Sequence, residues 1–332
     1  MASGPDVRRS SVLADLVALT KPRVISLLLV TTIAPMFATG GGLPPWSLVM
    51  IVALAGYLMA GGANAINMWF DRDIDQRMAR TRLRPVPAGR IAPPVALAFG
   101  IGLAAIAFGL FWELVNPLSA WLALAGLVCY VFIYTVWLKR SSPQNIVIGG
   151  AAGAFPALVG WAAVTGHLDL TAIYLFAIIF FWTPPHFWAL ALIKRHDYAR
   201  AGVPMLPVVR GEQYTRLAML IYALMLVPLT LMPVAWGAFG WLYAVAAGLL
   251  DVVFLWYCVR LWTPGGTTAA WKLYRYSLVY LLLLFVAMPI DRHLAPASAP
   301  PPSVTLRLTR LGARREPSKP NEPRGKFLEN GH

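Results

Sequence analysis

The chain has 332 residues, of which 58% are apolar and only 13% are charged. A soluble domain carries about 25% charged residues, so this composition cannot cover a water-facing surface of this size. The apolar excess predicts a protein embedded in lipid. The formal charge of +14 is confined to short segments between long uncharged runs, which argues against nucleic-acid binding and is typical of membrane proteins.

Long uncharged runs predict about nine transmembrane helices. Residues 24–70 contain no charged residue, and this run is too long for one span of about 20 residues. Glycines at 40–42 and prolines at 44–45 break it into two helices, at about 24–42 and 47–69. Helix pairs are predicted in the same way within 91–138, 141–193 and 217–259, and a short ninth run at 278–290 needs residues 274–277 to span. We expect an all-α polytopic membrane protein whose helices surround a central cavity.

The distribution of basic residues predicts the orientation. The turns near 40–46, 113–118, 165–171 and 237–240 contain no Lys or Arg, whereas the N-terminus and the other four loops contain most of the 28 basic residues. By the positive-inside rule, the N-terminus and these four loops face the cytoplasm. No cleavable signal or transit peptide is recognised, which indicates a bacterial plasma (inner) membrane protein.

Three regions follow from these patterns. Residues 1–23 are predicted to form a cytoplasmic N-terminal segment, 24–291 the membrane domain and 292–332 a disordered basic tail rich in proline. Cys129 and Cys258 lie inside apolar runs without metal-ligand spacing, so both are interpreted as small apolar residues.

The most informative polar cluster follows the second predicted helix. If that helix continues, Asn64, Asn67, Asp71 and Asp75 fall within about 80° of one another, and Asp73 points away. Two carboxylates in so little solvent repel each other, and a divalent cation would relieve that repulsion. Oxygen ligands favour a hard ion such as Mg²⁺, with Asp71, Asp75 and Asn67 as its ligands. The alternative is a solvated helix end whose acids are offset by the neighbouring arginines.

A second cluster lies in the sixth predicted helix. Pro184 and Pro185 should break or kink that helix and free backbone groups toward a cavity. His186 is then an intramembrane histidine about two turns from Lys194, and such a residue is a functional candidate. The alternative is a core histidine bonded to a backbone carbonyl.

A third cluster, Lys139 and Arg140, follows a run of aromatic residues. The two side chains suit a diphosphate, as a point charge and a planar fork. They could equally determine topology and bind nothing. Aromatic faces near the polar groups, including Trp182 and Trp188, can stabilise a carbocation in a dry site.

These motifs resemble a known family. The spacing Asn67-x-x-x-Asp71-x-x-x-Asp75 is similar to the first aspartate-rich motif of the UbiA-type intramembrane prenyltransferases. Three strings resemble one branch, the protoheme IX farnesyltransferases (haem O synthases): 71–75 with Arg80-Thr-x-x-Arg84-Pro, Trp182-Thr-Pro-Pro-His186-Phe-Trp188, and Asp197-Tyr followed by 201–207. The resemblance covers about residues 10–292. The second Asp-x-x-x-Asp motif of many relatives is missing here, which fits the haem branch.

The resemblance implies a Mg²⁺-dependent farnesyl transfer from farnesyl diphosphate to a vinyl group of haem b, with addition of water, giving haem O. It implies catalytic and metal-binding roles for Asn67, Asp71 and Asp75, and a haem-binding or haem-orienting role for His186. It also suggests a haem A synthase as a partner. The expected diphosphate-binding residues are Arg80, Arg84, Lys139, Arg140 and Lys194.

Two other functions stay open on the sequence alone. One is prenyl transfer to an aromatic quinone precursor, against which the missing second motif argues. The other is an ion-coupled transporter in which the Asn/Asp stripe binds the coupling ion, although the chain shows no internal repeat of the kind that many transporters carry.

Overall fold

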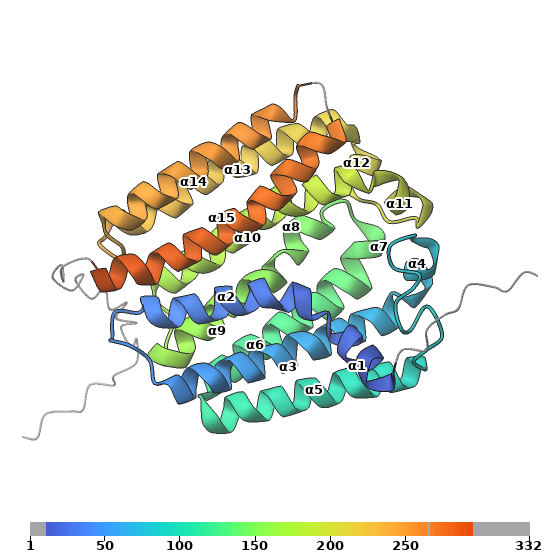
Figure 1. Cartoon of the computed structure of the whole chain (residues 1–332), viewed down its shortest axis with the longest axis horizontal. Coiled ribbons are helices and arrows are strands. Elements are labelled where there is room, and N and C mark those ends of the chain that lie inside the picture. Colours follow the sequence, from blue (N-terminus) through green and yellow to red (C-terminus); the bar gives the residue numbers. More distant parts are fainter. Residues whose placement is uncertain (1–10, 264–265, 295–332) are drawn as a thin grey trace, which may run out of the picture.

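The computed structural model describes residues 11–263 and 266–294, and all secondary structure in these ranges is helical. The long helices run side by side in one bundle (Figure 1). They are α2 (Pro22–Ala38), α3 (Trp46–Phe70), α5 (Pro93–Leu114), α6 (Pro117–Val128), α9 (Ala151–Thr165), α10 (Leu170–Ile193), α13 (Gly211–Ala235), α14 (Trp241–Arg260) and α15 (Gly266–Leu294).

Short helices gather at one end of the bundle, where residues 71–92, 139–145 and 194–210 connect the long helices (Figure 1). We call these three segments the basic end. The short helices there are α1 (Val12–Thr20), α4 (Arg72–Arg77), α7 (Lys139–Ser141), α11 (Arg195–Arg200) and α12 (Leu206–Val209). The remaining elements are a π-helix, η1 (Cys129–Leu138), and α8 (Asn145–Gly149), which leads into α9.

The expectation of about nine spans is confirmed. Within the described ranges, eight helical segments are long and apolar enough to cross a membrane, and α1 with α2 makes a ninth if the pair counts as one span. Two of the eight are composite: α6, η1 and α7 form one, and α8 and α9 form another. The chain bends by 43° between α1 and α2. Helix α1 falls in the segment that the sequence indicated only as an N-terminal segment.

Two local expectations differ from the structure. Pro184 and Pro185 were expected to break or kink the sixth helix, and there is no break, because α10 continues through both prolines. Such prolines are tolerated where neighbouring helices support the spanning helix, and α10 packs against α9, α13 and α15. The ninth run is also longer than predicted: α15 has 29 residues and ends at Leu294, three residues beyond the boundary expected at 291. The predicted disordered tail otherwise lies outside the described residues.

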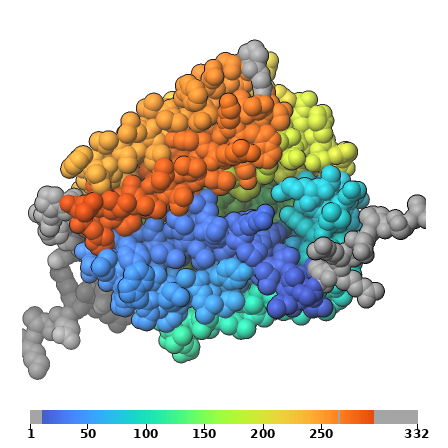
Figure 2. Space-filling view, viewed as in Figure 1, coloured from blue at the N-terminus to red at the C-terminus, as the bar shows by residue number. Residues whose placement is uncertain are grey.

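The first and last long helices are neighbours. Helix α2 lies against α9 on one side and α15 on the other, so the blue and orange-red segments meet on the face shown in Figure 2. The α2–α9 contact depends on a glycine, since a Cβ at Gly160 would lie 1.7 Å from the backbone oxygen of Thr32. Close approach at small residues is a general way to pack helices in lipid. This packing places the start of α2 beside the end of α3.

Candidate active site

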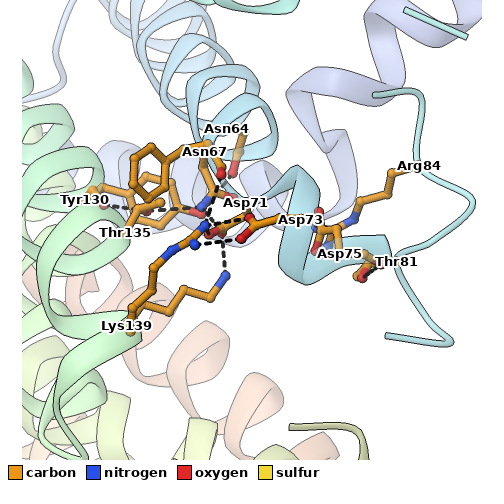
Figure 3. A network of polar contacts seen from close by, with 12 residues as sticks. Asn64, Asn67, Asp71, Asp73, Asp75, Thr81, Arg84, Tyr130, Thr135 and Lys139 are labelled. Atoms are coloured by element: carbon orange, nitrogen blue, oxygen red, sulfur yellow. Dashed lines mark hydrogen bonds and ion pairs between the residues drawn. The ribbon is translucent and has the colours of Figure 1, made fainter. Parts of the chain in front are cut away.

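The predicted Asn/Asp stripe is present, but on an interrupted helix. Helix α3 ends at Phe70, and Asp71 has φ −82° and ψ 6° before α4 begins at Arg72. Backbone hydrogen bonds nevertheless run from the Asp71 amide to Asn67 and from the Asp75 amide to Asp71, at 2.9 and 2.8 Å. Asn67, Asp71 and Asp75 therefore stay one turn apart, and all three are buried (Figure 3).

Asp71 is the most enclosed carboxylate of this cluster, with 0% exposure. Its Oδ2 accepts hydrogen bonds from the Lys139 ammonium and, at 2.7 Å, from Asn67 Nδ2. Its Oδ1 has no hydrogen-bond partner within the described ranges, and the closest recorded charge is Arg140 Nη2 at 3.7 Å. A buried carboxylate oxygen without a donor is costly, so this atom is poised to bind a cation or a donor.

Asn67 is fixed by two other parts of the chain, η1 and the joint between α1 and α2. Its Nδ2 also donates to Thr135 Oγ1 at 3.1 Å, and Thr135 in turn donates to the Tyr130 carbonyl at 2.8 Å. Its Oδ1 accepts a hydrogen bond of 2.8 Å from Lys21 Nζ. The Thr135 hydroxyl has only one proton, and it is used on Tyr130, so the Asn67 nitrogen must face Thr135 and Asp71 while the oxygen faces Lys21.

Asp75 is paired with a cation. Its Oδ2 accepts from Arg84 Nη1 at 2.7 Å, and the Thr81 hydroxyl donates to its backbone oxygen at 3.0 Å (Figure 3). The repulsion expected between Asp71 and Asp75 is thus offset by Lys139 and Arg84. These two basic side chains provide part of the positive charge that the sequence analysis expected from a metal ion.

Asp73 lies off the stripe, as predicted, with its side chain 51% exposed. Arg140 binds it through two hydrogen bonds of 2.7 and 2.8 Å and lies 4.7 Å from the Phe70 ring centroid. The hydrogen bonds from Arg140 lower the pKa of Asp73 to about 2. Arg140 therefore bridges the exposed Asp73 and the buried Asp71.

Two expected diphosphate ligands are not tied to this cluster. Arg80 is exposed, and Lys194 is half-buried at the C-terminal end of α10. No side-chain hydrogen bond or ion pair is recorded for either within the described residues. Burial raises the pKa of the Tyr198 hydroxyl, and the positive charges of Arg80 and Lys139 partly offset this rise.

His186 belongs to a separate buried cluster between α10 and α15. Its ring stacks between Trp182 and Tyr274, with centroid distances of 4.4 and 4.7 Å. His186 Nδ1 is 2.7 Å from Ser277 Oγ, and Ser277 Oγ donates to the Tyr274 carbonyl at 2.7 Å. Since the serine proton is used there, His186 Nδ1 carries the proton and donates to Ser277. The other ring nitrogen, Nε2, is then an acceptor, and no hydrogen-bond partner is recorded for it within the described ranges.

The two tryptophans expected near the site have different surroundings. Trp182 stacks on His186 and donates from Nε1 to the Ser277 carbonyl at 2.9 Å. Trp188 packs edge-on against Tyr222 of α13, 5.5 Å between centroids. The structure therefore joins Trp182 to the histidine cluster and places Trp188 in the packing between α10 and α13.

Sequence reasoning missed four residues of these two clusters: Lys21, Tyr130, Thr135 and Ser277. The last three carry no charge and lie in apolar runs, where no motif marks them. Lys21 had a visible signal, as a basic residue directly before a proline and the first span, but it was counted as a topology determinant.

Residues able to hold a metal are few. Within the described ranges, no group of three or more His, Cys, Asp or Glu side chains is arranged as a cation site. The set available at the stripe is two carboxylates and one amide, Asp71, Asp75 and Asn67. These are oxygen donors of the kind that Mg²⁺ uses together with phosphate oxygens, and the unpartnered Oδ1 of Asp71 fits that use.

Sequence comparisons place this arrangement in a family. The profile of the UbiA prenyltransferase family matches residues 27–287. A protein of Roseiflexus sp. (strain RS-1) named protoheme IX farnesyltransferase is 56% identical over 284 residues, which are 86% of this chain and 53% of that protein. A protein of the same name from Symbiobacterium thermophilum is 50% identical, over 86% of this chain and 96% of that protein. Another from Deinococcus radiodurans is 51% identical, over 84% of this chain and 93% of that protein. The chain thus spans about half the length of the Roseiflexus and Chloroflexus relatives.

Solved structures with low sequence identity share the fold. A digeranylgeranylglyceryl phosphate synthase structure superposes with a TM-score of 0.70 at 18% identity, covering 84% of this chain and 98% of that one. A UbiA homolog from Aeropyrum pernix K1 gives 0.66 at 19% identity, covering 80% and 97%. A UbiA homolog from Archaeoglobus fulgidus, bound to GPP and Mg²⁺, gives 0.60 at 14% identity, covering 82% and 99%. With the profile match and the relatives of half or more identity, the chain belongs to the UbiA prenyltransferase family.

Proposed function

We propose that this protein transfers a farnesyl group from farnesyl diphosphate to a vinyl group of haem b, with addition of water, to form haem O. Support comes from the relatives of 50–56% identity, all named protoheme IX farnesyltransferase. The single structural observation that carries the proposal is the buried Asn67–Asp71–Asp75 stripe at the basic end, ringed by cationic side chains.

The reaction balances without an oxidant or reductant. The bond between the farnesyl C1 and the diphosphate oxygen breaks, and the diphosphate leaves with both electrons. The vinyl carbon of haem b forms a bond to the allylic cation, and water adds to the resulting cation and loses a proton. The protein's part is to hold the leaving group, exclude water from the first cation and orient the porphyrin.

We infer that Asp71, Asp75 and Asn67 hold Mg²⁺ when the diphosphate is bound. The ion would supply charge neutralisation for the departing diphosphate. Lys139 and Arg84 already pair with the two carboxylates. Their positive charges therefore lie next to any anion that binds at the stripe. Arg140 adds a planar fork next to Lys139. Arg80 and Lys194 complete the proposed diphosphate-binding set from the surrounding loops.

The haem is proposed to use the cluster on α10 and α15. His186 offers a single free acceptor nitrogen, so it would bind the haem iron or a donor on the porphyrin edge. Trp182 supplies an aromatic face beside it, which would stabilise positive charge. Trp188 was expected to stabilise positive charge in the same way, but its ring packs against Tyr222 of α13. For Trp188 we therefore propose that it contributes by fixing the position of α10.

The chain is a multi-pass membrane protein related to bacterial enzymes. We propose that it lies in the plasma membrane with its N-terminus and the basic end in the cytoplasm, which follows from the basic loops. A haem A synthase acting on the product is proposed as a partner. Reporter fusions at residues 90 and 240 would test the orientation. A cytoplasmic signal is expected at residue 90 and an external signal at residue 240, and the reverse would contradict the proposed orientation.

The activity is tested by mass analysis of extracted haem. Purified protein is incubated with haem b, farnesyl diphosphate and Mg²⁺, with and without a chelator. The expected product is heavier by one farnesyl group plus water and disappears on chelation. Unmodified haem, from folded protein that binds farnesyl diphosphate, would exclude haem as acceptor and point to another one, such as a quinone precursor.

A further inference from the structure

Lys21 lies at the joint between α1 and α2, and its backbone is unusual. Its φ is 56° and its ψ 60°, and among the described residues it is the only one other than glycine with a positive φ. A left-handed conformation costs free energy for a residue with a Cβ, and residues held in this way concentrate at functional sites. The backbone conformation therefore marks Lys21 as a candidate functional residue.

The surrounding contacts fix the Lys21 backbone firmly. The preceding Thr20 accepts from Asn64 Nδ2 through its carbonyl at 3.0 Å, and its hydroxyl is 2.9 Å from the Tyr57 hydroxyl. Helix α1 is tied to the loop before α5 by the ion pair between Asp15 and Arg90, at 3.0 Å. The joint is therefore held in place from both sides, and the side chain of Lys21 is directed at Asn67.

The ammonium of Lys21 has one recorded protein partner within the described ranges. It has three N–H donors, and the recorded bond is the one to Asn67 Oδ1 at 2.8 Å. Lys21 is half-buried and Asn67 is a neutral amide, so this bond does not neutralise the charge of the ammonium. Within the described ranges Lys21 forms no ion pair, unlike Lys139 and Arg84.

The charges of the cluster show why this matters. The stripe and its surroundings contain three carboxylates, Asp71, Asp73 and Asp75, each paired with a basic side chain. Lys21 is a fourth cation beside Arg84, Lys139 and Arg140, and it interacts electrostatically with Asp75, Asp71, Arg84 and Lys139. Of these four cations, Lys21 is the one whose recorded hydrogen bond goes to an amide and not to a carboxylate. A half-buried ammonium of this kind favours an anion.

We propose that Lys21 is a diphosphate-binding residue of this site, whose ammonium exchanges the Asn67 amide oxygen for an oxygen of the prenyl diphosphate. The inference rests on the proposed function and assigns that function a residue on α1–α2, outside the loops that carry the other basic candidates. The exchange also releases Asn67 Oδ1, which Lys21 otherwise occupies. One side chain thereby couples arrival of the anion to availability of the amide oxygen.

The test is binding of inorganic diphosphate, in the presence of Mg²⁺, to the full chain in lipid nanodiscs by titration calorimetry. For Lys21→Gln we expect binding about 10- to 100-fold weaker, since a charged hydrogen bond is lost. Lys21→Arg should recover most of it. The matched control is Arg23→Gln, which removes the same charge two residues away from an exposed side chain and should bind as the native chain does.

Farnesol binding separates this role from a structural one. Farnesol has no charge, so Lys21→Gln should bind it as the native chain does. Equal losses for farnesol and diphosphate would mean that Lys21 only holds Asn67, and unchanged diphosphate binding would also overturn the inference while leaving the proposed function intact. If the native chain binds neither inorganic diphosphate nor farnesyl diphosphate, the proposed function itself fails.

Discussion

Two buried aspartates in this bundle have opposite surroundings. Asp71, where α3 ends, is paired with Lys139 and has an oxygen without a donor. Asp251, within α14, is 2% exposed and accepts hydrogen bonds of 2.6 Å from Thr230 of α13 and Tyr280 of α15. Each Asp251 oxygen is satisfied by a neutral hydroxyl, and no ion pair is recorded for it within the described ranges.

The difference shows how the same residue type serves two purposes. A carboxylate saturated by hydroxyls from two neighbouring helices fixes how those helices pack, and it leaves nothing for a ligand. A carboxylate with one ammonium partner and one oxygen that lacks a hydrogen bond is able to take a further partner. Substitutions at the two positions should therefore separate activity from stability.

The largest effect is expected at Asp71. Asp71→Ala removes a proposed metal ligand and the partner of Lys139, so haem O formation should fall by about 100-fold or more, measured by product mass. Farnesyl diphosphate turnover in Asp73→Ala, two residues away and with an exposed side chain, should stay within about tenfold of native. Equal activity of native and Asp71→Ala protein would remove the metal assignment.

The next effect is expected at Ser277, which orients His186. Ser277→Ala leaves His186 Nδ1 without its acceptor, so haem b affinity should fall by about 10- to 100-fold, as is usual for partners that orient a ligand histidine. The Soret band of bound haem should shift, and Ser277→Thr should restore it. An unaltered band and affinity in Ser277→Ala would show that His186 does not act through this hydrogen bond.

A smaller effect, on stability alone, is expected at Asp251. Asp251→Ala leaves the buried Tyr280 hydroxyl without its acceptor, whereas the Thr230 hydroxyl can still donate to the Val227 carbonyl. The free energy of unfolding should therefore fall by about 1–3 kcal/mol. Asp251→Asn should lose less, because its oxygen still accepts one hydrogen bond. Both variants should bind farnesyl diphosphate with native affinity in calorimetry. A selective loss of substrate binding would contradict the division between the two aspartates.

The smallest effect is expected from the Asp73–Arg140 pair. The pKa of Asp73 is lowered from 3.8 to about 2, so the pair's contribution to stability is fully present above pH 4 and is lost as the pH falls toward 2. Because Asp73 is half exposed, the contribution is small. Melting temperatures of native and Asp73→Asn protein should differ little between pH 5 and 8. A large difference in that range would show that Arg140 holds more than an exposed ion pair.

Much of the fold was predictable from the sequence because lipid imposes a simple rule. Each span must be long and largely uncharged, so the uncharged runs, divided at their glycine and proline breaks, predicted the number of spans and the basic connections. The Asn67–Asp71–Asp75 spacing likewise predicted a shared helix face, since hydrogen bonding between residues four apart survives the break at Asp71.

The tertiary structure decided which groups meet. The partners of Asn67 and His186, at positions 21, 135 and 277, are 46, 68 and 91 residues away in the chain. No local pattern encodes such contacts, because they arise when whole helices pack side by side. The same packing kept α10 continuous through Pro184 and Pro185, against the local preference of proline. Sequence alone determined the helices and the chemical character of the site, and packing determined which charged and polar side chains meet there.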